Sequence, residues 1–120
     1  MEKNIIHKVM KPWGHEEIWA LTDKYCAKFL FIKRGHRLSR QFHEVKDETI
    51  YVLQGQLRLE LGHENDLETF ILKPGDKYHV TPLTVHRFCA SEDNDVTLAE
   101  VSTTELNDVV RVHDDYNRTS

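Results

Sequence analysis

The sequence is short of the features that mark several classes of protein. It contains only two cysteines, Cys26 and Cys89, which lie far apart. They form neither a disulfide framework nor the closely spaced thiols of a zinc knuckle, so we expect two small buried side chains in a reducing compartment. No apolar run approaches the roughly 18 residues of a membrane span, and residues 1–10 lack the apolar stretch of a signal peptide. We therefore expect a cytoplasmic protein that makes no membrane contact.

A basic surface is also missing. Lys and Arg total 16 against 20 Asp and Glu, which gives a formal net charge of -4. A mildly acidic chain lacks the positive patch that nucleic-acid binding needs. The chain has 120 residues with a hydrophobic share of 39%, which suits one domain with one core. Histidine, by contrast, is abundant: eight residues of this type point to a metal or proton-transfer site.

Alternation with a period of two dominates the hydrophobic pattern. Residues 56–61 place Leu57, Leu59 and Leu61 on one face and polar side chains on the other, between two glycines. Further short strands are expected at residues 27–33, 49–53, 69–72, 77–81, 87–90, 97–101 and 109–112. Turn signals recur about every ten residues, and no segment shows a helical period. The pattern predicts an all-β sandwich or barrel in a single domain.

Four potential metal ligands lie in two glycine-bounded stretches of the sequence. Gln41 and His43 are two residues apart, so a strand directs them to the same face. Glu48 follows after a tight connection, and His86 comes from a strand distant in sequence. Two imidazoles, a carboxylate and an amide oxygen form a mixed site that suits zinc, manganese, iron, nickel or cobalt. We predict one divalent ion bound by these four residues, with zinc as the first choice.

The spacing of these residues resembles the two motifs of the cupin superfamily. The first motif is occupied here by Gly35, Gln41, His43, Glu48 and Gly55, with Gln where cupins usually have His. Gly75 and His86 keep the spacing of the second motif, although Thr81 replaces its proline and Leu83 its glycine. The resemblance implies the cupin double-stranded β-helix, a jelly-roll barrel, over residues 11–118. Residues 1–10 would form an N-terminal strand or arm.

A narrower resemblance is to the C-terminal cupin domain of type II mannose-6-phosphate isomerases. That family has the same residues at Lys28, Lys33, Gly35, Arg37, Leu38, Ser39, Gln41 and His43. Residues 11–14 resemble its Arg-Pro-Trp-Gly signature, and residues 108–111 and 115–118 resemble its C-terminal segments. A departure follows His43, where the family is rich in histidine and this chain reads Glu44-Val45-Lys46-Asp47. The resemblance implies a metal-dependent aldose–ketose isomerase with a sugar phosphate as its small-molecule substrate.

Such an isomerase needs a Lewis acid, a general base beside the reacting carbon and cations for the phosphate. The candidates for the base are Glu100, Lys28 and His79. The candidates for the phosphate, in order of preference, are Arg37, Arg111 and Arg87. Arg37 stands first because residues 37, 39, 41 and 43 of one continuous strand would share a face.

Two other functions fit the same motifs. A non-catalytic cupin could bind a sugar or sugar nucleotide at the metal, and an iron-dependent dioxygenase also uses two histidines and a carboxylate. A basic pocket favours the sugar ligands, whereas a dry apolar pocket favours the dioxygenase. We also expect a homodimer, because edge strands need cover and Ile5, Ile6 and Val9 make the N-terminal segment apolar enough to pair across a two-fold axis.

Overall fold

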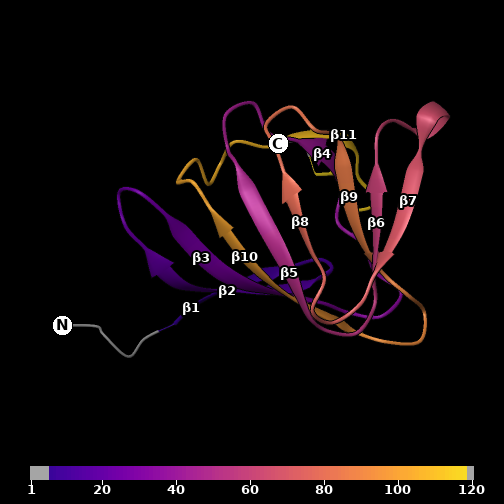
Figure 1. The fold of residues 1–120 in the computed structure, drawn as a ribbon, viewed down its shortest axis with the longest axis horizontal. Helices are drawn as coiled ribbons and strands as arrows, with labels where there is room; N and C mark the ends of the chain where they lie inside the picture. The colour runs from indigo at the N-terminus through magenta and orange to yellow at the C-terminus, as the bar shows by residue number, and fades with distance from the viewer. Residues whose placement is uncertain (1–5, 119–120) are drawn as a thin grey trace.

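The computed structural model describes residues 6–118 and shows two antiparallel β-sheets that face each other (Figure 1). The strands of the larger sheet are β1 (His7–Lys11), β2 (Gly14–Leu21), β3 (Cys26–Ile32), β5 (Glu48–Gln54), β8 (Lys77–Val80) and β10 (Val96–Ser102). The strands of the smaller sheet are β4 (Arg40–Phe42), β6 (Leu57–Leu61), β7 (Glu68–Leu72), β9 (His86–Ala90) and β11 (Val110–His113). A single 3-10 turn, η1 (Glu64–Asp66), forms the tip of the hairpin between β6 and β7.

The strand order explains how the chain closes into a barrel. The larger sheet runs β1-β2-β3-β10-β5-β8 and the smaller sheet runs β11-β4-β9-β6-β7. Strands far apart in sequence, such as β3 and β10, are neighbours because the chain crosses repeatedly between the two sheets. This all-β, two-sheet jelly roll confirms the predicted fold class. Within residues 6–118, no helix is long and apolar enough to cross a membrane.

Most predicted strands are present, and the ones that were missed lack alternation. The inward face of β2 carries Glu16 beside Ile18, and β4 is only three residues long. β1 covers residues 7–11 of the expected N-terminal strand, while residues 1–5, including Ile5, lie outside the described residues. Cys26 and Cys89 are both free and buried, as expected.

The apolar core lies between the sheets and is built by the inward faces of the strands. Leu98 of β10 is fully buried opposite Val52 of β5, and Leu57 and Leu59 contribute from the smaller sheet. Each fully buried leucine contributes about 1.5–3 kcal/mol through the hydrophobic effect.

The same inward faces become polar towards one end of the barrel. Two residues beyond Leu98, β10 places Glu100 inward, opposite Lys28 of β3. The next inward pair joins Ser102 of β10 to Glu48 of β5. The fold therefore closes one end of the barrel with apolar side chains and buries charged side chains at the other end.

The turn between β5 and β6 depends on Gly55. Its φ angle is +80°, and a Cβ atom at this position would collide with the carbonyl oxygen of Asp95. A residue with a side chain is therefore both strained and sterically blocked here. Backbone geometry, and not ligand chemistry, accounts for the closing glycine of the first motif.

Candidate metal centre

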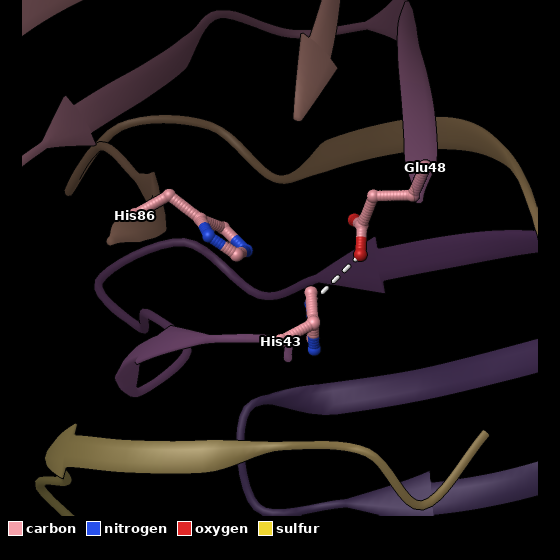
Figure 2. Close-up of side chains that lie close together, drawn as sticks. All are labelled: His43, Glu48 and His86. Atoms are coloured by element: carbon pink, nitrogen blue, oxygen red, sulfur yellow. Dashed lines mark ion pairs between the residues drawn. The ribbon is translucent and has the colours of Figure 1, made fainter. Parts of the chain in front are cut away.

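Three of the predicted ligands come from different strands and converge at the polar end of the barrel (Figure 2). His43 follows β4 directly, Glu48 begins β5 and His86 begins β9. One ligand atom of each lies within 4.8 Å of the others, and all three residues are buried. Nε2 of His43 is 2.8 Å from Oε1 of Glu48, and the two imidazole centroids are 5.2 Å apart.

Backbone carbonyl groups orient both imidazoles. Nδ1 of His43 donates to the carbonyl oxygen of Asp108 at 2.6 Å, and Nδ1 of His86 donates to that of Thr84 at 2.8 Å. A carbonyl oxygen only accepts, so each Nδ1 carries the hydrogen and a neutral ring keeps its Nε2 lone pair for a metal. Burial lowers the pKa of His86, which favours this neutral form.

One buried carboxylate oxygen of Glu48 makes no hydrogen bond within the described part of the chain. Oε1 makes no hydrogen bond of good geometry to any described residue, although Nε2 of His43 lies 2.8 Å away and Nζ of Lys46 3.4 Å away. Burial opposes ionisation of this carboxyl, but the neighbouring His43, Lys46 and His86 outweigh burial and hold the pKa of Glu48 below its usual range. A carboxylate beside two imidazole lone pairs fits a divalent cation of the predicted mixed class.

Gln41 lies next to these three residues. It pairs in register with His86 across β4 and β9, and it lines the same cavity. Its amide nitrogen donates to the hydroxyl of Ser39 at 2.7 Å, which leaves the amide oxygen as the atom available to a ligand. Its role as a fourth metal ligand stays a prediction.

A cavity of about 250 Å³ opens in front of the candidate ligands. Trp13 and Phe88 form apolar parts of its wall. The charged residues that line it are Lys11, Glu16, Lys28, Lys46, Glu48, Glu100, Arg111 and Arg118. The chain therefore builds a polar, charged cavity and not a dry apolar one.

Two buried lysines and buried carboxylates form a connected cluster in this wall. Nζ of Lys28 lies 3.3 Å from Oε1 of Glu16 and 3.8 Å from Oε2 of Glu100. Nζ of Lys46 lies 3.5 Å from the same oxygen of Glu100 and 3.4 Å from Glu48. Burial, followed by the charge of Glu48, raises the pKa of Glu100 to about 7 against the opposing effect of the two lysines. Two base candidates, Glu100 and Lys28, thus lie together at the cavity.

No pattern in the sequence identifies Lys46 as a residue of the cavity. It stands in the loop between β4 and β5, where no periodicity indicates which way a side chain points. The only available signal was its position between two candidate ligands. The structure buries its ammonium group between Glu48 and Glu100, where it can hold both carboxylates in place.

His79 lies apart from the other base candidates. On β8, Val80 is buried and Tyr78 packs against the core, so His79 points to the opposite side of the strand. Its side chain is exposed, and Nε2 lies 2.6 Å from Oδ1 of Asp47. The structure does not bring His79 to the cavity, because the parity of the strand directs it outward.

Of the three predicted phosphate-binding arginines, Arg111 lines the cavity. Arg37 instead makes two hydrogen bonds of 2.7 and 3.0 Å to Asp115, and Arg87 is buried and donates to the carbonyl oxygen of Leu38. The continuous strand assumed for residues 37–43 is wrong: β4 covers only Arg40–Phe42, and residue 37 forms an isolated bridge to Cys89. The face shared by Arg37 and Gln41 was the reason to rank Arg37 first, and that reason does not hold.

The loop before His86 contains a strained residue at the second cupin motif. Leu83, which stands where the motif usually has glycine, has a φ angle of +69°. Its backbone N–H donates to the carbonyl oxygen of His43 at 2.7 Å. This hydrogen bond connects the loops that carry His43 and His86. Leu83 donates it from a left-handed backbone conformation, which is unfavourable for a leucine.

Known proteins show the same fold and related sequences. The Cupin domain family matches residues 28–102 of this chain. The chain is 26% identical over 116 residues to the alginate biosynthesis protein AlgA of Pseudomonas aeruginosa. The match covers 94% of this chain and 23% of AlgA, so the chain spans about a quarter of the length of that relative.

Two solved structures illustrate the structural likeness. The capsular polysaccharide assembling protein CapF of Staphylococcus aureus superposes with a TM-score of 0.79 at 14% identity, over 91% of this chain and 34% of CapF. KdgF of Halomonas sp. superposes with a TM-score of 0.70 at 25% identity, over 88% of this chain and 94% of KdgF. At 14% identity, the likeness to CapF shows the fold alone.

Proposed function

The chain belongs to the cupin domain family, and on that premise we propose that it is a metal-dependent aldose–ketose isomerase of the mannose-6-phosphate isomerase type. The similarity to AlgA, a protein named for alginate biosynthesis, extends over 94% of the chain and supports a carbohydrate substrate. The buried triad of His43, Glu48 and His86 supports a divalent metal, with zinc as the first choice.

The observation that carries this proposal is the position of Glu100. Its carboxyl group is buried in the wall of the cavity that the candidate metal ligands also line. Oε2 makes no hydrogen bond within residues 6–118, and burial raises the pKa of this carboxyl group to about 7, which suits uptake and release of a proton near neutral pH. A general base in an aldose–ketose isomerase must reach a carbon acid next to the metal-bound end of the substrate.

The remaining residues of the cluster suit supporting roles in proton transfer. A bound divalent metal would supply a Lewis acid for the carbonyl oxygen of the substrate. Glu100 would take the proton from the neighbouring carbon and return it to the adjacent one. Lys46 and Lys28, 3.5 and 3.8 Å from Oε2, would hold this carboxyl group in place. Lys28 also contacts Glu16, so it is less suited than Glu100 to act as the base.

The lining of the cavity separates this proposal from its competitors. Lysine, arginine and glutamate side chains line the cavity, which favours a polar ligand over the apolar substrate expected for a dioxygenase. A cupin that binds a sugar without turnover differs from an isomerase only in its kinetics. Interconversion of the two sugar phosphates therefore decides between these two functions.

The test uses mannose 6-phosphate and fructose 6-phosphate with protein loaded separately with zinc, manganese, iron, nickel and cobalt. We expect interconversion in a coupled assay, and NMR should detect incorporation of solvent deuterium at the carbon that loses its proton. Glu100→Gln should keep the metal and lower turnover by about 10²–10⁴-fold. Glu68→Gln, an exposed change on β7, serves as the matched control. Wild-type protein that holds a metal but gives neither signal with any ion would overturn the isomerase proposal.

A further inference from the structure

Arg111, Gln41 and His86 form a row across three neighbouring strands of the smaller sheet. The register pairs Arg111 of β11 with Gln41 of β4, and Gln41 with His86 of β9. Residues paired in this way direct their side chains to the same face of a sheet. All three line the cavity. Because adjacent strands are about 4.8 Å apart, the backbone of Arg111 lies about 10 Å from that of His86.

Arg111 differs from its neighbouring arginines because it makes no ion pair with any acidic residue in the described range 6–118. Its buried Nε atom makes no hydrogen bond within residues 6–118. Arg37, Arg87 and Arg118, by contrast, each contact an aspartate of the C-terminal segment. Burial, followed by the positive charge of Arg118, lowers the pKa of Arg111, and Asp114 only partly opposes these effects. The guanidinium group therefore has donors and positive charge that the described chain leaves uncompensated.

Each carboxylate in the cavity wall lies near a lysine and not near Arg111. Glu16 contacts Lys28, Glu48 contacts Lys46, and Glu100 lies near both lysines. These three carboxylates lie on β2, β5 and β10 of the larger sheet, whereas Arg111 comes from β11 of the smaller sheet; Lys11 of β1 also lines the cavity. An arginine with free donors binds phosphate and carboxylate groups in a planar, two-pronged geometry.

We propose that Arg111 binds the anionic group of a monosaccharide that carries one such group. The other end of this sugar reaches the site formed by His43, Glu48 and His86. The row of three residues then sets the length of the ligand, with Gln41 beside its middle. A cavity of about 250 Å³ is of the size that one sugar unit needs. The oxyanion is the phosphate of a sugar phosphate or the carboxylate of a sugar acid. This inference rests on the proposed function only for the sugar nature of the ligand.

Calorimetric titration of the metal-loaded protein tests the assignment without turnover. The probes are mannose 6-phosphate, glucuronate and uncharged mannose. We expect Arg111→Gln to weaken binding of the preferred anionic probe by roughly tenfold or more, with metal content and mannose binding unchanged. Arg111→Lys keeps the positive charge but loses the two parallel N–H donors of the guanidinium group. Its affinity for the anionic probe should lie between those of wild type and Arg111→Gln. Arg34→Gln, at the exposed turn after β3, is the matched control.

Each outcome of this titration decides the point. Preference for mannose 6-phosphate or for glucuronate identifies phosphate or carboxylate as the bound group. Equal anion affinity in wild type and Arg111→Gln removes Arg111 from the site, as does wild-type protein that binds neither anion. Binding that depends on Arg111, in a protein that does not interconvert the two sugar phosphates, keeps this inference and overturns the isomerase. Thermal melting shows whether Arg111→Gln is folded, and Arg111→Lys provides the comparison if it is not.

Discussion

The backbone carbonyl oxygen of Asp108 accepts the Nδ1 hydrogen bond of His43 at 2.6 Å, and the carboxylate of Asp108 binds the loop that follows His43. Its two oxygens accept the backbone N–H groups of residues 44, 45 and 46 at 3.0, 2.7 and 2.9 Å. These three bonds lower the pKa of Asp108 to about 2. One residue near β11 therefore orients one candidate ligand and shapes the chain that leads to Glu48.

Asp108→Asn is expected to weaken metal binding by about tenfold, because it disturbs the loop and leaves the backbone bond to His43 in place. The amide offers one acceptor oxygen where the carboxylate offers two, so at least one loop bond is lost. Competition with a chelator measures the metal affinity. Asp66→Asn, in the exposed turn η1, is the control. Equal affinity in both variants and wild type would show that the loop does not depend on this carboxylate.

His43→Ala and His86→Ala are each expected to reduce bound metal from one ion per chain to less than about a tenth of that. Each change removes one of only two imidazole nitrogens in the site. Elemental analysis of the purified protein measures the metal content. His63→Ala, beside the hairpin tip, should retain a full complement of metal. Full metal content in both of the first two variants would place the metal elsewhere.

Leu83→Gly is expected to stabilise the fold by up to about 1 kcal/mol. A left-handed conformation costs a residue with a side chain about 1–2 kcal/mol, and the greater chain entropy of glycine offsets about 0.5–1 kcal/mol of that gain. Urea denaturation measures the free energy of unfolding. Leu67→Gly is the matched control, because Leu67 has a φ angle of -70° and should lose stability. A loss of stability at both positions would contradict strain at Leu83.

Asp114 should contribute to stability in a pH-dependent way. Burial opposes its ionisation, but Arg118 outweighs burial through bonds of 2.9 and 3.1 Å and lowers the pKa of Asp114 to about 2, against 3.8 ordinarily. A lowered pKa stabilises the folded state above pH 4, and this stabilisation disappears as the pH falls from about 4 to about 2. Asp114→Asn should therefore lower the free energy of unfolding at pH 7 by about 1 kcal/mol.

Urea denaturation at pH 7, 4 and 2.5 tests this linkage. The difference between wild type and Asp114→Asn should shrink at the lowest pH, because the wild-type carboxylate is then partly protonated. Asp93→Asn, in an exposed turn, is the control. If the difference in free energy of unfolding between wild type and Asp114→Asn stayed the same at all three pH values, the effect would not come from ionisation of Asp114.

The homodimer expected from the sequence stays a prediction, and the outer face of the larger sheet offers exposed apolar side chains on which to test it. Trp19 is half exposed and stacks on Phe29 with ring centroids 5.9 Å apart, and Tyr51 and Val101 are exposed on neighbouring strands. We expect light scattering to give a molar mass of about 28 kDa, twice the 14.1 kDa of one chain. Trp19→Glu should shift the mass towards that of one chain. A wild-type mass of about 14 kDa at micromolar concentration would contradict a dimer.

The sequence alone determined the strands whose faces alternate and the order of the candidate ligands along the chain. Leu57, Leu59 and Leu61 indicate a half-buried strand because neighbouring side chains of a strand point to opposite sides. The spacing of His43, Glu48 and His86 along the chain indicates a metal site without any knowledge of the fold. β2 was missed because its inward face carries Glu16 as well as Ile18.

Only the tertiary structure decided which cations and bases lie at the cavity. Lys46 and Asp108 act through contacts to residues on other elements, and no local pattern reveals such contacts. Arg111 lines the cavity because β11 pairs with β4, whereas Arg37 precedes β4 and binds Asp115. Periodicity in the sequence predicts on which face of its own strand a side chain lies. Which side chains of different strands then become neighbours depends on the register between strands that are distant in sequence, and packing of the whole barrel determines that register.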